Sequence, residues 1–214
     1  MGKHLVFDLD KLREYCDEVN PLDAKQTIQD LKSKLKKYKD LYALSAPQIG
    51  INERVICIKF NDGVIKEYIN PMVLKSEGLH LVRERDISIP DQEFICPRPN
   101  KILVRYQTET AKPEENILKD SVAEVFDRMM NYLQGVTLDD YGLPILEGFD
   151  ELSKGEQEKI INMYLNSLKK REELLNDNIE NDKDAKELKD AIRFMEAVDK
   201  GEVKLEDPVL LKKK

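Results

Sequence analysis

Side chains that could do chemistry are few in this sequence and poorly matched to one another. The only histidines are His4 and His80, which limits both metal binding and acid–base chemistry. Ser45 and Ser88 have no obvious histidine to serve as their base, and Cys96 would need one to act as a nucleophile. The chain contains no G-x-S-x-G, no C-x-x-C and no phosphate-binding glycine loop. Common nucleophilic and nucleotide-binding enzymes are therefore not indicated.

Three segments nevertheless follow one another in a recognisable order. They are Leu41–Gln48, Glu84–Ser88 and Arg128–Gly135, with Ile69-Asn70-Pro71 and Arg98-Pro99 between them. This order and spacing resemble peptide deformylase, the metal hydrolase that removes the formyl group from nascent protein N-termini. The resemblance covers roughly residues 10–145. It implies an α+β fold in which antiparallel sheets surround a central helix containing Arg128–Leu133.

The first segment departs from the family at its glycines. The family motif G-x-G-L-A-A-x-Q, in which the glutamine orients the reacting carbonyl, keeps that residue here as Gln48. Leu41 and Ala43 stand where the family has glycines, and their side chains obstruct close backbone approach. Tyr42 would project toward the place where a substrate's first side chain enters. The resemblance thus implies a closed or reshaped pocket.

The other two segments depart from the family at the metal site. The family's E-G-C-L-S and H-E-x-D-H-L-x-G supply a cysteine and two histidines as ligands and a glutamate as general acid/base. Here Asp86 stands at the cysteine, Arg128 and Tyr132 at the histidines, and Met129 at the glutamate. Arg128 stays protonated and cannot ligate a metal. Met129 has no proton to exchange. We therefore expect no catalytic residue, no metal and no cofactor, and a protein that is not an enzyme.

The replacements are chemically compatible with one another. If Asp86 and Arg128 occupy the family positions, their opposite charges converge, and Tyr132 could donate a hydrogen bond to Asp86. We predict a structural Asp86–Arg128 ion pair in place of the metal, since removing one partner of such a pair is costly. The alternative is that both side chains reach solvent through an opened cleft.

Apolar spacing predicts the elements that position these residues. Helices are expected at 10–20, 24–42 and Ile117–Leu133. Strands are expected at Arg54–Phe60, Val64–Ile69, Val73–Leu74 and Ile102–Tyr106, with a hairpin turn at Asn61-Asp62-Gly63. Cys57, inside an apolar strand, is expected to be buried.

The composition changes near Gly148, which divides the chain into a deformylase-like domain, 1–147, and a charged helical extension, 148–214. Ser153-Lys154-Gly155-Glu156 has the form of a capping box and should open a helix. A second apolar stripe ends at Gly201, so residues 151–200 predict a helical hairpin. Its narrow apolar faces need a partner surface, either this protein's own domain or another chain.

Charge and composition bound the partners. A net charge of −7 argues against general nucleic-acid affinity, and no apolar run is long enough for a membrane span. Three widely spaced cysteines indicate a reducing compartment. The resemblance to deformylases, together with the loss of the metal ligands, implies a binding or structural subunit of a larger assembly, either translation-associated or part of a phage particle, located in the cytoplasm or a virion. The alternative is a hydrolase or formyl-peptide binder with a rebuilt site around Gln48 and Asp86.

Overall fold

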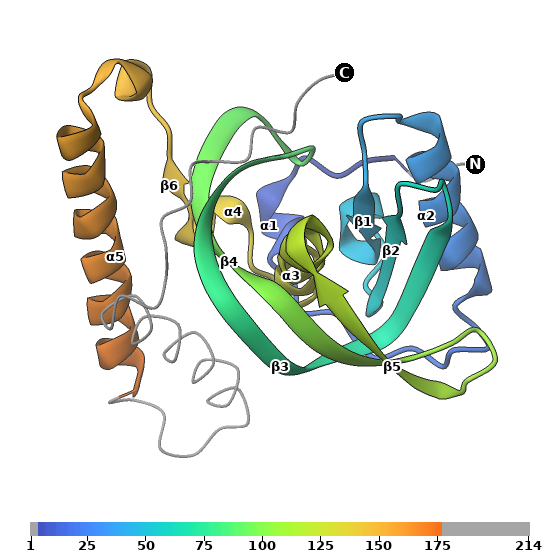
Figure 1. Ribbon diagram of the computed structural model, residues 1–214. Coiled ribbons are helices and arrows are strands. Elements are labelled where there is room, and N and C mark those ends of the chain that lie inside the picture. Colours follow the sequence, from blue (N-terminus) through green and yellow to red (C-terminus); the bar gives the residue numbers. More distant parts are fainter. Residues whose placement is uncertain (1–3, 177–214) are drawn as a thin grey trace.

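A computed structural model describes residues 4–176 of the chain. A six-stranded antiparallel sheet runs in the order β1-β2-β3-β4-β5, and β6 pairs with β4 (Figure 1). The strands are β1 (Ala43–Ser45), β2 (Val55–Lys59), β3 (Ile65–Asp86), β4 (Ile89–Gln107), β5 (Pro113–Lys119) and β6 (Leu143–Pro144). The helices are α1 (Leu9–Leu12), α2 (Lys25–Lys37), η1 (Ala46–Ile49), α3 (Asp120–Leu133), α4 (Leu138–Tyr141), η2 (Phe149–Glu151) and α5 (Lys154–Asn176). The predicted α+β architecture is confirmed.

The two long strands β3 and β4 curve around α3, as Figure 1 shows. Irregularities in their pairing near Ile69, Val73 and Arg85 supply the bend, since a bulge adds a residue and increases local twist. Asn70 adopts φ 47° at the first irregularity, and its side chain exchanges two hydrogen bonds with the backbone of Val19, at 3.0 and 2.8 Å. The Ile69-Asn70-Pro71 segment therefore lies at a bend of β3 and anchors the N-terminal segment around Val19 to it.

Helix α3 forms the centre of the main core. Its apolar residues recur every three or four positions, so Phe126, Met129, Met130 and Leu133 lie on its buried side. The ring of Phe126 meets Tyr68 of β3 edge-on, with centroids 5.2 Å apart. Burial of each such side chain contributes about 1.5–3 kcal/mol. This packing places the Arg128 segment inside the curve of the sheet.

Helix α2 covers a second core beside β1 and β2. Ile28, Leu31 and Leu35 are buried against Leu44 and Cys57, which confirms the predicted burial of Cys57. The helix ends earlier than the predicted residue 42, because Tyr38 is extended. Lys59 Nζ donates to three carbonyls at this end, those of Leu35, Tyr38 and Lys39. A cation there stabilises the helix C-terminus.

Other predicted boundaries were wrong for tertiary reasons. The helix expected at 10–20 is limited to α1, because the Cys16 backbone amide donates instead to the carbonyl of Leu133. The residues from Ile117 to Lys119 belong to β5, not to a helix. Val64–Ile69 and Val73–Leu74 were predicted as separate strands, but β3 continues through Asn70. The predicted turn at Asn61–Gly63 is confirmed, with Gly63 at φ 84°.

Helix α5 packs against the outside of the sheet. Leu165 joins Phe149 and two strand residues, Leu81 and Ile95, in a small apolar cluster. The predicted capping box is present: Ser153 donates to Glu156 Oε2 through its amide at 3.0 Å and its hydroxyl at 2.6 Å. The first helix of the predicted hairpin thus contacts this protein's own domain. The rest of the hairpin lies outside the described residues, and the boundary at 147/148 stays a prediction.

None of the helices within the described part of the chain has the length and apolar character needed to cross a bilayer.

Candidate functional site

The five candidate site residues come from three elements that meet inside the curve of the sheet. Gln48 lies in η1, Asp86 ends β3, and the remaining three, Arg128, Met129 and Tyr132, lie on α3. Gln48 and Asp86 are directly linked by a hydrogen bond, and Asp86 and Arg128 by an ionic contact. The structure therefore brings together residues that are up to 84 positions apart, from 48 to 132.

Both polar ends of the Gln48 side chain form hydrogen bonds within the protein. Its side chain is 1% exposed. Oε1 accepts hydrogen bonds from the Ser45 amide at 3.1 Å and the Ser45 hydroxyl at 3.2 Å, which caps the short η1 helix. Nε2 donates to Asp86 Oδ1 at 3.2 Å and to Ser88 Oγ at 3.3 Å. Gln48 therefore orients the Asp86 carboxylate.

Asp86 and Arg128 face each other below the surface. Asp86 Oδ1 also accepts the Ser88 amide at 2.8 Å, and Oδ2 lies 3.4 Å from Arg128 Nε. The exposed fractions of the two side chains are 2% for Asp86 and 14% for Arg128, so neither opens to solvent through a cleft. Arg128 Nε lacks hydrogen-bond geometry toward any partner. The contact is thus electrostatic rather than a directional hydrogen bond.

Arg128 is held more tightly by the neighbouring strand residues. Its Nη1 donates to Glu84 Oε2 at 3.0 Å and to the Arg85 carbonyl at 2.9 Å. Burial alone would lower the pKa of Arg128, but the charges of Glu84 and Asp86 raise it above its ordinary value. The guanidinium therefore stays charged inside the protein.

Glu84 connects Arg128 to a second buried guanidinium, which belongs to Arg98 of β4. Arg98 is 1% exposed, and its Nε and Nη2 both donate to Glu84 Oε1, at 2.9 and 2.5 Å. Its Nη1 donates to Asp127 Oδ2 at 2.7 Å, and Nη2 also contacts the hydroxyl of Tyr141. Charge-assisted bonds of this kind are about twice as strong as neutral ones. The network thereby joins β3, β4, α3 and α4.

This extension of the network was not foreseen in the sequence, although a signal was available. In a strand, alternate residues share a face, so Glu84 must point to the same side as Asp86. Arg98 belongs to one of the segments that carry the family resemblance, and no ion pair was predicted for it. Arg98 shares that face, because it lies four residues from Phe94, the residue of β4 that pairs with Glu84. An acidic and a basic side chain on one buried face indicate an ion pair.

Met129 and Tyr132 belong to the apolar core around α3. Each is 1% exposed. Burial and the charge of Asp86 raise the pKa of Tyr132, so its phenol stays protonated. Its hydroxyl, however, has no hydrogen bond of normal geometry. The predicted Tyr132–Asp86 hydrogen bond is therefore absent, although the two groups interact electrostatically.

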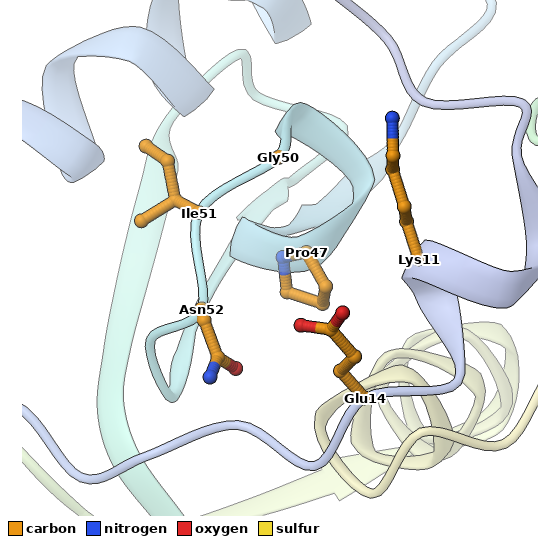
Figure 2. Close-up of a pocket in the computed structure, with 6 residues that line it drawn as sticks. All are labelled: Lys11, Glu14, Pro47, Gly50, Ile51 and Asn52. Carbon is orange, nitrogen blue, oxygen red and sulfur yellow. The ribbon is translucent and has the colours of Figure 1, made fainter.

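Two further features lie apart from this network. Asp139 and Asp140 lie in the first turn of α4 and both pair with Arg13, at 2.6 and 2.9 Å. A surface pocket lies beside η1, where Figure 2 shows Glu14 pointing toward Pro47. Its lining residues are Lys11, Glu14, Pro47, Gly50, Ile51 and Asn52. None of the five candidate residues lines this pocket.

Comparison with known proteins gives a consistent result. The family model described as polypeptide deformylase matches residues 3–143. A peptide deformylase of Fusobacterium nucleatum is 25% identical over 138 residues, or 59% of this chain and 79% of the relative. Peptide deformylase 2 of Clostridium acetobutylicum is 28% identical over 131 residues, or 60% of this chain and 87% of the relative.

Solved structures agree with these sequence relatives. The crystal structure of peptide deformylase from Thermotoga maritima superposes with a TM-score of 0.61 at 27% identity, covering 65% of this chain and 97% of the other. The deformylase of the Vibrio parahaemolyticus bacteriophage VP16T, solved with actinonin, shares the fold with a TM-score of 0.58 at 23% identity, covering 63% of this chain and 98% of the other.

The prediction that the chain is not an enzyme is wrong in the light of these findings. The relatives are named peptide deformylases, and a name of that kind denotes an enzyme. The prediction had rested on four substituted motif positions, Asp86, Arg128, Met129 and Tyr132, and no finding shows inactivity. The expectation of a deformylase relationship is confirmed.

Proposed function

Since this chain belongs to the peptide deformylase family, we propose that it functions by binding a protein partner as a subunit of a larger assembly. One observation carries this proposal: an apolar patch is exposed on the outer face of the sheet, beside an open strand edge. A translation-associated complex and a phage particle are the two assemblies that the sequence suggests.

The apolar patch spans three neighbouring strands. Met72 and Leu74 of β3 are 56% and 37% exposed, and Ile117 of β5 is 53% exposed. Leu103 of β4 lies between them, since it is paired with Lys75 on one side and with Ile117 on the other. Single exposed apolar residues are common, but a cluster on adjacent strands is typical of an interaction surface.

The surroundings of the patch also resemble a binding surface. Strand β5 ends the strand order, so one row of its backbone groups has no partner strand among the described residues. Next to it, Arg105 Nη2 donates to Glu115 Oε1 at 2.7 Å. An apolar centre with a charged rim is the usual anatomy of a protein interface.

Helix α5 covers a different part of the same outer face. It packs around Leu81 and Ile95 and leaves Met72 and Ile117 exposed. In Figure 1, α5 stands beside one arm of the β3–β4 curve, while β5 lies away from it. The partner that we propose therefore binds the end of the sheet that α5 does not cover.

The proposal is tested by co-purification of the tagged full-length chain from its source cells, with the partners quantified by mass spectrometry. The disruptive variant is Met72→Glu combined with Ile117→Glu, which places two charges in the patch. The matched control is Val64→Glu, because Val64 is 58% exposed at the β2–β3 turn, outside the patch. We expect a stoichiometric partner with the wild type and the control, and at least tenfold less with the double variant.

Hydrolysis of formyl-Met-Ala-Ser is measured on the same three proteins. If the double variant still binds the partner, the partner does not bind through this patch, and that part of the proposal is wrong. If wild type and double variant both hydrolyse the peptide efficiently and no stoichiometric partner is found, the proposal is wrong. The function would then be deformylation, the activity for which the relatives are named.

A further inference from the structure

Arg128 joins the end of β3 to α3 through two hydrogen bonds and one ionic contact. Its Nη1 binds Glu84 Oε2 at 3.0 Å and the Arg85 carbonyl at 2.9 Å, and its Nε lies 3.4 Å from Asp86 Oδ2. All three oxygen atoms belong to the last three residues of β3, Glu84 to Asp86. The pairing of β3 with β4 shifts register between Arg85 and Asp86. A single cation thus gathers the end of one strand onto the central helix.

We infer that the Arg128 guanidinium is the resident cation of this site and cross-links β3 to α3 in place of the divalent metal that the family implies. The inference concerns the stability and metal content of this chain and does not rest on the proposed protein partner. It makes folding independent of divalent metal.

The donors present do not fit a divalent metal ion. Such a site needs three protein ligands and an open position. Among residues 4–176, no three histidine, cysteine or acidic side chains come together as a metal-binding group. The Asp86 carboxylate faces Arg128 Nε, and its Oδ1 already accepts from Ser88 and Gln48. Tyr132 is a protonated phenol inside the core.

The charges of the network also favour the guanidinium over an added metal. Glu84, Asp86 and Asp127 carry three negative charges, and Arg98 and Arg128 carry two positive ones, which leaves a formal charge of −1. A divalent ion beside Asp86 would sit within a few ångströms of Arg128, where like charges repel more strongly than in water because both side chains are largely buried. Binding a metal would therefore require displacement of Arg128.

Two buried atoms show how the arginine fits the space. Arg128 Nε and Tyr132 Oη are both buried and have no hydrogen-bond partner of normal geometry. An unsatisfied buried polar group is costly, so the site is not optimised as a hydrogen-bond network. What holds it is charge: the guanidinium is attracted by both Glu84 and Asp86. Removal of the Arg128 charge should therefore destabilise the buried carboxylates, and removal of the Asp86 charge should destabilise the buried guanidinium.

The first measurement is the metal content of wild-type protein purified without chelator, together with thermal melting in EDTA and in added Zn²⁺, Fe²⁺ or Ni²⁺. We expect less than one tenth of an equivalent of metal and no change in melting temperature. One equivalent of bound metal, or a melting temperature that EDTA lowers, would overturn the inference.

The second measurement is a double-mutant cycle with Asp86→Asn and Arg128→Met. Each single variant should lower the melting temperature by roughly 6–20 °C, because it leaves an unpaired buried charge. The double variant should lose less than the sum of the two, whereas additive losses would show that the residues do not act as a pair. Arg128→Lys keeps the charge and should melt closer to wild type than Arg128→Met. If the methionine variant fails to fold, the lysine variant still tests whether the charge at this position stabilises the protein.

The third measurement restores the family ligand types in this chain. The variant Asp86→Cys, Arg128→His and Tyr132→His should bind close to one equivalent of Zn²⁺ and gain melting temperature on zinc addition. The matched control, Asp86→Cys and Tyr132→His with Arg128 retained, should bind at least tenfold less zinc. Equal zinc binding by the two variants would show that Arg128 does not exclude the metal.

Discussion

Arg98 and Glu84 form a two-pronged ion pair across β3 and β4, with Arg98 Nε and Nη2 both donating to Glu84 Oε1, at 2.9 and 2.5 Å. The side chains are 1% and 9% exposed. Glu84 Oε2 is also the acceptor for Arg128 at 3.0 Å. One carboxylate therefore bridges the two guanidiniums, and Asp127 and Asp86 supply further negative charge to them.

Replacement of Glu84 by glutamine should destabilise the fold strongly. The amide cannot neutralise Arg98 and Arg128, so both remain as buried cations with less compensation. We expect a loss of about 3–5 kcal/mol in the free energy of unfolding. Urea denaturation followed by circular dichroism measures it. The control is Glu77→Gln, since Glu77 pairs with Lys75 and Lys101 at the surface and should show no resolvable change. Similar losses for both variants would contradict the central role of Glu84.

The contribution of Glu84 should also depend on pH. Burial alone would raise the pKa of Glu84, but the charges of Arg98 and Arg128 lower it below its ordinary value. Because the folded-state pKa is the lower one, the stabilisation is complete above the unfolded-state pKa of about 4.3 and is lost as the pH falls through the folded-state value. The difference in unfolding free energy between wild type and Glu84→Gln should therefore shrink below about pH 4.

Asp127 acts in the opposite direction, because burial raises its pKa above the ordinary value despite the lowering by Arg98. Its contribution is present in both proteins, so the comparison of wild type with Glu84→Gln subtracts most of it. Urea titrations at a series of pH values from neutral to acidic provide the data. A difference that stays constant across the whole series would show that Glu84 titrates normally in the folded protein.

The sequence predicted the fold through its resemblance to a family whose motifs follow one another in a fixed order, and some of the local elements through short-range signals. The Ile69-Asn70-Pro71 segment marks a backbone irregularity, and its asparagine adopts φ 47° as such a position requires. Ser153 and Glu156 predicted a helix start because a capping box needs only four consecutive residues. The proximity of Asp86 and Arg128 was inferred from two motifs, and the structure places their charged atoms 3.4 Å apart.

What the sequence did not predict depends on contacts between distant residues. The helix expected at 10–20 stops at Leu12 because the following backbone bonds to the end of α3. The hydroxyl of Tyr132 was expected to bind Asp86, but it has no hydrogen-bond partner of normal geometry. The roles of Glu84 and Arg98 emerge only from strand pairing. The prediction that the chain is not an enzyme was wrong because it rested on the substituted motif residues alone, whereas the relatives are named peptide deformylases.

Substitution of Gly135 by alanine should destabilise the contact between α3 and the N-terminal segment. Gly135 has φ 70°, and a Cβ there would lie 2.4 Å from the carbonyl oxygen of Arg13. We expect a loss of more than about 2 kcal/mol, from the strained backbone together with the clash. Gly63→Ala is the control, because Gly63 has φ 84° but open space around it, so about 1–2 kcal/mol of strain alone is expected. Equal losses for the two variants would rule out the clash.

Truncation of Leu165 to alanine should weaken the attachment of α5 to the sheet. Leu165 is 5% exposed and packs with Leu81, Ile95 and Phe149, so the change removes buried apolar contact on both sides of the interface. We expect a loss of about 2 kcal/mol in unfolding free energy. This value is at the low end of the range for a buried leucine, because several residues of the surrounding cluster are only partly buried. Faster proteolytic cleavage within α5 should accompany it. Met163→Ala, at a side chain 65% exposed on the same helix, should change neither quantity. If Leu165→Ala leaves both unchanged, α5 does not depend on this face of the domain, and its apolar stripe is available to another chain.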